Sequence, residues 1–272
     1  MTPRLTIVVD WSGGNDRGPR PKADAIWIAR DGQDAVYLRN RQVAEVWLHD
    51  AIADAINSNI PLLIGFDFPF GYPRGFARAL CNSDDPLDLW AWFADHIQDS
   101  PSQNNRFDIA GQINARFAGV GPFWGNGLRR DIPDLPRRGR DRAANPFAER
   151  RHVEAQTKGT FTCWQMSGAG SVGGQVMMGL PMLHRLRHAF SEHIRVWPFE
   201  PAEKLITFAE VWPSLVTGPA PQGMIKDAHQ VITTASHFAH MPAAQFDRAL
   251  SVPHVAAQEG WILGVLPETT DP

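Results

Sequence analysis

The sequence predicts an α/β fold built on a mixed β-sheet, with helices on both faces of the sheet. The first observation is the apolar run at residues 5–9, which ends at Asp10 before Trp-Ser-Gly-Gly and is typical of a central strand buried on both faces. The second is a pair of strand patterns at 25–29 and 35–38, which with the first strand predict an antiparallel three-strand meander. The third is the alternation of helical and strand patterns that follows, as expected of α/β sheets.

The elements after the meander follow from hydrophobic periodicity. Apolar residues at helical spacing predict a helix over 43–56, and a second buried run at 61–66, which ends at Asp67, predicts the next strand. The chain then predicts a helix at 88–97, a short strand at 161–165, a helix at 175–190, strands at 194–198 and 205–212, and a helix at 226–240. Between them, about 100–160 forms an irregular segment too long for an ordinary loop. We expect one domain over residues 1–272, with this segment as an insertion within it.

Composition excludes several classes of protein. Cys81 and Cys163 cannot build a disulfide framework, which favours a reducing compartment. Hydrophobic residues make up 43% of the chain and charged residues 20%, and no apolar run reaches about 18 residues, so neither disorder nor a membrane span is expected. The first apolar run begins almost directly after Met1, which argues against a secretion signal. We therefore expect a soluble, cytoplasmic protein without a membrane partner.

Arginine is concentrated in the predicted insertion. Of the 26 basic residues 22 are Arg, and eight of these lie between Arg129 and Arg151 together with only four acidic residues. Arg forms forked contacts with carboxylates and phosphates, so the segment could bind an anionic ligand. The residues expected to do so are Arg137, Arg138, Arg140 and Arg142. A solvated insertion rich in Pro and Arg explains the same composition equally well.

Four carboxylates are predicted to meet at one end of the sheet. Asp10 and Asp67 each terminate a buried strand run, and ligands of α/β sheets bind beyond the carboxyl ends of the strands. The alternation in 205–212 places Glu210 on an apolar face, and helical phase turns Asp227 toward the sheet and Lys226 toward solvent. Such a cluster would repel itself without a cation, and hard oxygen ligands suit Mg²⁺ or Mn²⁺.

Each acid also has a simpler explanation. Asp10 and Asp67 could close turns through their side chains. Asp227 could be a first-turn acid favoured by the helix dipole. Glu210 could pair with a buried Arg, because burying it without a partner would be costly. The sequence leaves these alternatives open for each residue taken singly, and the conjunction of the four favours a shared site.

Four ordered motifs resemble those of the ribonuclease H-like superfamily, namely VVDWSGG at 8–14, LLIGFDFPFG at 62–71, FAEVWPS at 208–214 and KDAHQVITTASHFA at 226–239. More specifically, they resemble a bacterial family of predicted ribonuclease H-like nucleases catalogued as a domain of unknown function. The similarity extends to residue 262 and is weakest over 100–160. It implies that Asp10, Asp67, Glu210 and Asp227 hold two divalent metals for phosphodiester cleavage. Close relatives in that family carry a molybdopterin-guanine dinucleotide synthesis label, which no residue here supports independently.

A glycine-rich stretch and several aromatic residues are further candidates for ligand binding. Residues 168–173 match G-x-G-x-x-G before a predicted helix, but their place after a meander and a long insertion argues against a standard dinucleotide-binding domain. Gly170 and Gly173 could instead offer backbone amides to a phosphate, and Ser12 could contact one from its Gly-rich turn. Pure turn chemistry explains these residues as well. Tryptophans more often fill the core, but six of the 10 could stack on bases, namely Trp11, Trp124, Trp164, Trp197, Trp212 and Trp261.

These observations predict a metal-dependent phosphoryl-transfer enzyme, most concretely a nuclease that cleaves phosphodiester bonds with two Mg²⁺ or Mn²⁺ ions. The alternatives are a nucleotide-handling transferase or ATPase-like enzyme, and a non-catalytic module that binds nucleic acid or protein through the Arg-rich segment. The sequence does not identify the substrate, its strandedness or the oligomeric state.

Overall fold

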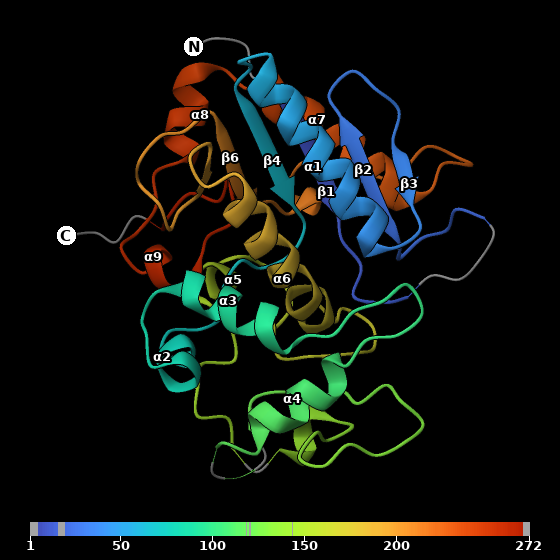
Figure 1. Ribbon diagram of the computed structural model, residues 1–272, viewed down its shortest axis with the longest axis vertical. Coiled ribbons are helices and arrows are strands. Elements are labelled where there is room, and N and C mark those ends of the chain that lie inside the picture. The colour runs from blue at the N-terminus through green and yellow to red at the C-terminus, as the bar shows by residue number, and fades with distance from the viewer. Residues whose placement is uncertain (1–4, 16–19, 118, 120, 143, 269–272) are drawn as a thin grey trace.

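The computed structural model describes residues 5–15, 20–117, 119, 121–142 and 144–268. Within these residues six strands form one sheet in the order β3-β2-β1-β4-β6-β5 (Figure 1). The strands are β1 (Leu5–Asp10), β2 (Ile26–Arg30), β3 (Val36–Leu38), β4 (Leu62–Phe66), β5 (Ile194–Val196) and β6 (Ile206–Glu210). β2 is antiparallel to β1 and β3, whereas β1, β4, β6 and β5 are mutually parallel. The predicted α/β class and the antiparallel meander are confirmed.

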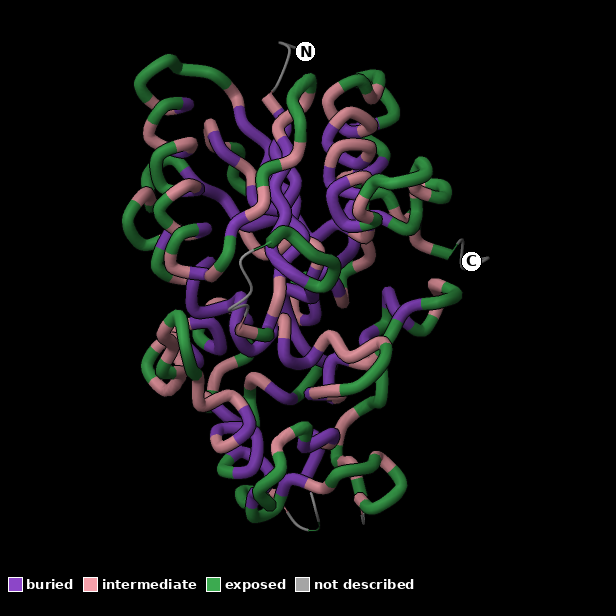
Figure 2. The backbone as a smooth tube through the Cα atoms, turned by 90° about the vertical axis from the view of Figure 1, so that its right-hand side faces the viewer, coloured by how far each residue is buried: buried purple, intermediate pink, exposed green. Residues whose placement is uncertain are grey.

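Helices cover both faces of this sheet. They are α1 (Arg41–Asn57), α2 (Phe76–Cys81), α3 (Pro86–His96), α4 (Arg106–Asn114), α5 (His152–Gln156), α6 (Gly173–Ala189), α7 (Lys226–Ala239), α8 (Ala243–Ala249) and α9 (Ala256–Glu259), with 3₁₀ turns at Gly139–Asp141 and Pro213–Leu215. One apolar cluster joins the sheet to α1, α3 and α6, and a second joins the opposite face to α7 and α8. In Figure 2 the strands between these layers are buried over most of their length.

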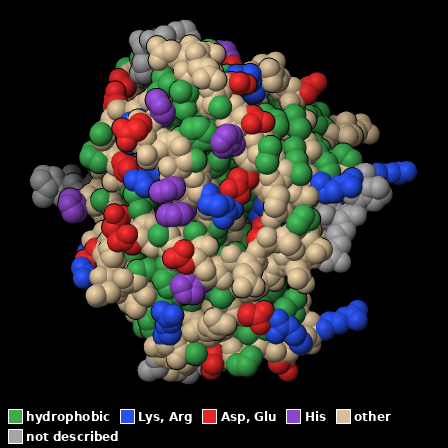
Figure 3. Space-filling view, in the orientation of Figure 1, with side chains coloured by type: hydrophobic (Ala, Val, Ile, Leu, Met, Phe, Trp, Pro, Cys, Tyr) green, Lys and Arg blue, Asp and Glu red, His purple; other side chains and the backbone are tan. Residues whose placement is uncertain are grey.

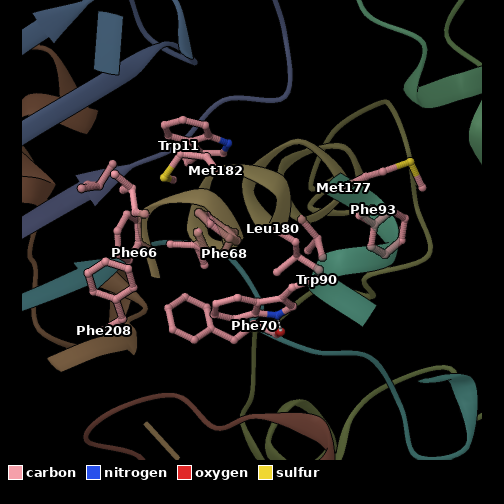
Figure 4. Close-up of a cluster of buried hydrophobic side chains, with 14 of the residues drawn as sticks. Trp11, Phe66, Phe68, Phe70, Trp90, Phe93, Met177, Leu180, Met182 and Phe208 are labelled. Atoms are coloured by element: carbon pink, nitrogen blue, oxygen red, sulfur yellow. Dashed lines mark hydrogen bonds between the residues drawn. The ribbon is translucent and has the colours of Figure 1, made fainter. Parts of the chain in front are cut away.

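Strand alternation sorts side chains between the two clusters. In β1, Ile7 and Val9 belong to the α6 side and Val8 to the α7 side, as the two-residue period of a strand requires. Phe66 and Phe208 extend the α6 side on β4 and β6. Figure 4 shows Phe66, Phe68 and Phe70 packed with Phe208 and residues of α6, so the turn after β4 is anchored by alternate aromatic side chains.

The segment between α3 and α6 contains ordered structure that the sequence did not predict. It includes α4 and α5, and it lies beyond one end of the sheet (Figures 1 and 2). The side chain of Asn114 joins distant turns of this segment, since its amide nitrogen donates to the carbonyls of Phe123 and Asp134 at 2.8 and 2.7 Å. The strand expected at 161–165 is wrong. Within the described ranges those residues pair through a single bridge, between Trp124 and Gln165, because Cys163 and Trp164 are buried in an aromatic cluster instead of a sheet.

No helix in the described part of the chain is long and apolar enough to span a membrane.

Candidate functional site

The carboxyl ends of three parallel strands bring acidic residues to one edge of the sheet. Val9 of β1 lies opposite Phe66 of β4, which lies opposite Glu210 of β6. Asp10 and Asp67 each follow the paired residues Val9 and Phe66, and neighbouring strands lie about 4.8 Å apart. The two aspartates therefore lie side by side, and the backbone amide of Asp67 donates to the carbonyl of Val9 at 2.9 Å.

These acids line one cavity of about 790 Å³. Asp10, Asp67, Glu210 and Asp227 all contribute to its wall, so the four carboxylates lie around one cavity at the expected end of the sheet. A role as metal ligands further depends on the spacing of their side chains. Within the described ranges, no group of three His, Cys, Asp or Glu side chains stands at a spacing that could hold a metal ion.

Asp10 and Asp67 differ from Glu210 and Asp227 in their hydrogen bonding. Among the residues that the structure describes, no hydrogen-bond donor reaches either carboxylate. Burial raises the pKa of Asp10 well above its ordinary value, and the charges of Asp67, Asp227 and Asp24 add to the rise. Burial likewise raises the pKa of Asp67 to about 7, together with the charges of Glu210 and Asp227. Two adjacent carboxyls with raised pKa values favour binding of a cation.

Asp227 approaches the same cavity from the first turn of α7. One of its oxygens accepts the backbone amide of Asp24 at 2.6 Å, which fixes the orientation of the carboxylate. Burial raises its pKa above the ordinary value. Lys226 is exposed, as helical phase predicted, but it also lines the cavity, and its charge lowers the pKa values of Asp10, Asp67 and Asp227.

Glu210 has a protein partner for each of its oxygens. Arg151 donates to Oε2 at 2.8 Å and to Oε1 at 2.6 Å, and the backbone amide of Phe70 donates to Oε2 at 3.1 Å. Arg151 is fully buried and also donates to Glu154 and to the carbonyl of Glu259, both at 3.0 Å. Pairing with a buried Arg, one of the alternatives that the sequence left open, is therefore what the structure contains. Asp10, Asp67 and Asp227 remain as the carboxylates available to a ligand.

Ser12 and the glycines differ in their relation to the cavity. Ser12 lines it, but its hydroxyl donates to the carbonyl of Asp24 at 3.1 Å and accepts the amide of Gly14 at 3.2 Å, which closes the turn. Gly170 also lines the cavity. Gly173 does not offer its amide to a phosphate, because that amide donates to the carbonyl of Gln165 at 2.9 Å. This prediction is wrong, and the next residue, Gly174, lines the cavity instead.

The four predicted Arg ligands stand apart from this cavity in the described chain. Arg137 donates to Asp131 at 2.7 Å and to the carbonyl of Leu128 at 2.8 Å, and Arg142 donates to the carbonyl of Pro122 at 2.8 Å. Both side chains thereby hold the insertion together. Arg138 and Arg140 are exposed. On the face seen in Figure 3, basic side chains are interspersed with acidic ones, which fits a solvated surface better than a continuous basic track.

Sequence reasoning missed several residues that shape the site. Asp24 lies in a polar turn, and Arg106 and Arg151 lie in the insertion, where no periodicity marks them as inward-facing. Phe161 also lines the cavity, and its apolar neighbourhood suggested a strand. Of these residues, only Lys226 could have been identified from the sequence, because it precedes the predicted site residue Asp227 at the start of a helix.

No protein-family model, curated protein or solved structure matches this chain. The functional argument therefore rests on the site itself.

Proposed function

We propose that this protein is a metal-dependent phosphoryl-transfer enzyme with a ribonuclease H-like fold, most concretely a nuclease that cleaves phosphodiester bonds. The observation that carries the proposal is the pair Asp10 and Asp67, adjacent carboxylates, one buried and one half-buried, without protein donors among the described residues, with Asp227 on the wall of the same cavity. The sheet order, with a meander and then parallel strands that end at acids, supports the same proposal.

The donor set fits a hard divalent cation. Asp10, Asp67 and Asp227 offer only carboxylate oxygens, the ligands that Mg²⁺ and Mn²⁺ prefer. Burial raises their pKa values first, and for Asp10 and Asp67 the charges of neighbouring carboxylates add to the rise, which a cation would offset. The adjacent pair Asp10 and Asp67 would hold the metal, since Mg²⁺ is usually bound through one or two carboxylates, and when bound it would lower the pKa of water and stabilise charge on phosphoryl oxygens. Glu210 contributes less directly, since Arg151 neutralises it.

The protein's own residues position the reacting groups around this metal site. The amide of Asp24 fixes the Asp227 carboxylate. Lys226 places a cation on the wall of the same cavity, where it can attract a phosphate. The buried aromatic side chains of Phe66 and Phe68 hold the Asp67 turn in place, so the carboxylate is presented from a rigid support (Figure 4).

Metal-linked stability and metal-dependent turnover test this proposal. Millimolar Mg²⁺ or Mn²⁺ should raise the melting temperature of the wild type through binding to the native state. Asp10→Asn should remove most of that rise, whereas Asp247→Asn, at an exposed residue on α8, should preserve it. Cleavage of an oligonucleotide that requires the metal supports the nuclease. Metal-dependent turnover of ATP or GTP alone supports a nucleotide-handling transferase, and neither activity, without a metal-induced rise, contradicts both.

A further inference from the structure

Phe161 is an aromatic side chain that lies outside both hydrophobic clusters. It is 49% exposed, and among the large hydrophobic side chains that are most exposed in the described chain it is the one that lines the acidic cavity. The other described Phe and Trp side chains are buried or half-buried. A ligand that covers this ring would remove its exposed apolar surface from water, which favours binding.

The Phe161 ring rests on a glycine that accommodates it. A Cβ built on Gly170 would lie 2.2 Å from a carbon of the ring, so any side chain at 170 would displace the ring. Gly170 also has a φ of 71°, which L side chains rarely adopt. The glycine-rich loop at 168–170 thereby supports one side of the ring while nearly half of the side chain stays accessible to a ligand.

Trp212 provides a second aromatic surface on the same cavity. It follows β6, is half-buried, and packs against the apolar cluster on the α7 side of the sheet. A Cβ on Gly159 would lie 3.4 Å from its ring, so the chain just before Phe161 contacts Trp212 as well. Two anchored aromatic rings lining one cavity are suited to stacking on a flat, unsaturated ligand.

The cavity also has cations for a phosphate. Lys226 lines it, and within the described part of the chain its ammonium has no hydrogen-bond partner. Arg106 lines it too, and its Nε is buried without an acceptor in the described structure. Burial lowers the pKa of Arg106 to about 10, so the guanidinium remains charged at neutral pH. Aromatic rings, cations and carboxylates that suit a divalent ion are therefore combined in one cavity of about 790 Å³.

We infer that this cavity binds a single unpaired nucleotide unit, with its base stacked on Phe161 and Trp212 and its phosphate near Lys226, Arg106 and the carboxylates. The inference rests on the proposed function and narrows its substrate class. A base that is paired and stacked within a duplex cannot present its face to these rings, so the preferred ligand is a free nucleotide or a single strand.

Equilibrium binding tests this inference with three probes, namely a fluorescent single-stranded oligothymidylate, its abasic counterpart with the same number of phosphates, and thymidine monophosphate as competitor. Measurements in the Asp10→Asn background with Mg²⁺ limit cleavage during the titration. The base-bearing strand should bind more tightly than the abasic strand by about 5- to 150-fold, the range for one stacked base. Competition by thymidine monophosphate identifies a free nucleotide as ligand, and binding of the strand alone identifies single-stranded nucleic acid.

Variants at Phe161 separate stacking from simple apolar contact. Phe161→Leu should remove most of the preference for the base-bearing strand, whereas Phe161→Trp should keep it. Val46→Ala, at an exposed position on α1, serves as the control and should change nothing. Circular dichroism of each variant confirms that the fold is retained. Equal affinity for base-bearing and abasic strands, binding that Phe161→Leu leaves unchanged, or no binding of any probe would each overturn the inference.

Cleavage assays keep this result separate from the proposed function. Metal-dependent cleavage by the wild type that is equally fast on strands with and without bases, and unaffected by Phe161→Leu, would overturn the nucleotide inference and leave the nuclease proposal standing. Base-dependent binding without any metal-dependent cleavage would leave the inference standing and contradict the nuclease.

Discussion

Asp67 makes a quantitative prediction about the stability of the metal-free protein. Burial and the charges of Glu210 and Asp227 raise the pKa of its carboxyl to about 7, against an ordinary value of 3.8. Between roughly pH 4 and pH 7 the folded protein therefore holds a proton that the unfolded chain has released. Because the folded state binds more protons in this window, the free energy of unfolding must fall as the pH rises through it.

The size of this effect follows from the same values. Each pKa unit corresponds to about 1.4 kcal/mol, so a rise from 3.8 to about 7 corresponds to at most about 4 kcal/mol. The Asp67 side chain is only half-buried, and screening by solvent leaves roughly 2 to 4 kcal/mol. Asp67→Asn has no charge to acquire, so it should exceed the wild type in stability by this amount at pH 8 and match it near pH 4.

Urea unfolding in EDTA at several pH values between 4 and 8 measures this difference for wild type, Asp67→Asn and the control Asp247→Asn. Asp10 and Asp227 also have raised pKa values, so part of the pH dependence should persist in the Asp67 variant. The reasoning is refuted if Asp67→Asn is no more stable than Asp247→Asn at pH 8, or if the wild type gains stability between pH 5 and pH 7.

Three further predictions concern other parts of the structure. Arg151→Leu should cost about 3–5 kcal/mol, because Glu210 would stay buried without its cation, whereas Arg185→Leu, which breaks only a surface pair with Glu45, should cost less than about 1 kcal/mol; equal costs in urea unfolding would contradict the buried pairing. Gly13→Ala should cost about 1–3 kcal/mol or more, since its Cβ would lie 2.5 Å from the backbone of Gly174, while Gly218→Ala, with open space around it, is the control in thermal melts. If the insertion contacts a nucleic acid strand, replacing the exposed Arg138 and Arg140 with Ala should reduce the salt slope of binding by about 1.5; an unchanged slope would mean that this surface does not touch the strand. Arg137 and Arg142 stay unchanged in this variant, because they hold the insertion together.

The helices and strands that could be predicted from sequence are those whose hydrophobic pattern follows their burial over many residues. The buried runs of β1 and β4 are apolar throughout because both faces of each strand are covered, and α7 has one apolar stripe because it packs on one side of the sheet. Helix α4 could not be found this way. It has only nine residues, and helices this short are marginal without tertiary support. That support comes from contacts outside the helix, such as the hydrogen bonds that the Asn114 amide donates to the carbonyls of Phe123 and Asp134.

The same distinction applies to the site. Asp10 and Asp67 could be predicted because each directly follows a buried strand, and the carboxyl ends of parallel strands lie at the same end of the sheet. Glu210 was placed on the correct face, that of Phe208, but its partner Arg151 lies 59 residues away, and no local pattern reports such a pairing. The sequence predicts Phe161 as part of a strand, because a short apolar run has the same pattern in a sheet and in the wall of a cavity.

The Arg151 ion pairs have a consequence for how the chain folds. Arg151 connects the end of β6, through Glu210, to the last residue of α9, Glu259, which lies 108 residues from Arg151 in sequence. Contacts between such distant segments form only after the entropy of loop closure has been overcome. Before Arg151 is in place, burial of the charged Glu210 carboxylate carries a large desolvation cost. We therefore expect the end of β6 and α5 to become ordered together, so amide hydrogens of α5 and of β6 should exchange together, as parts of one cooperative unit.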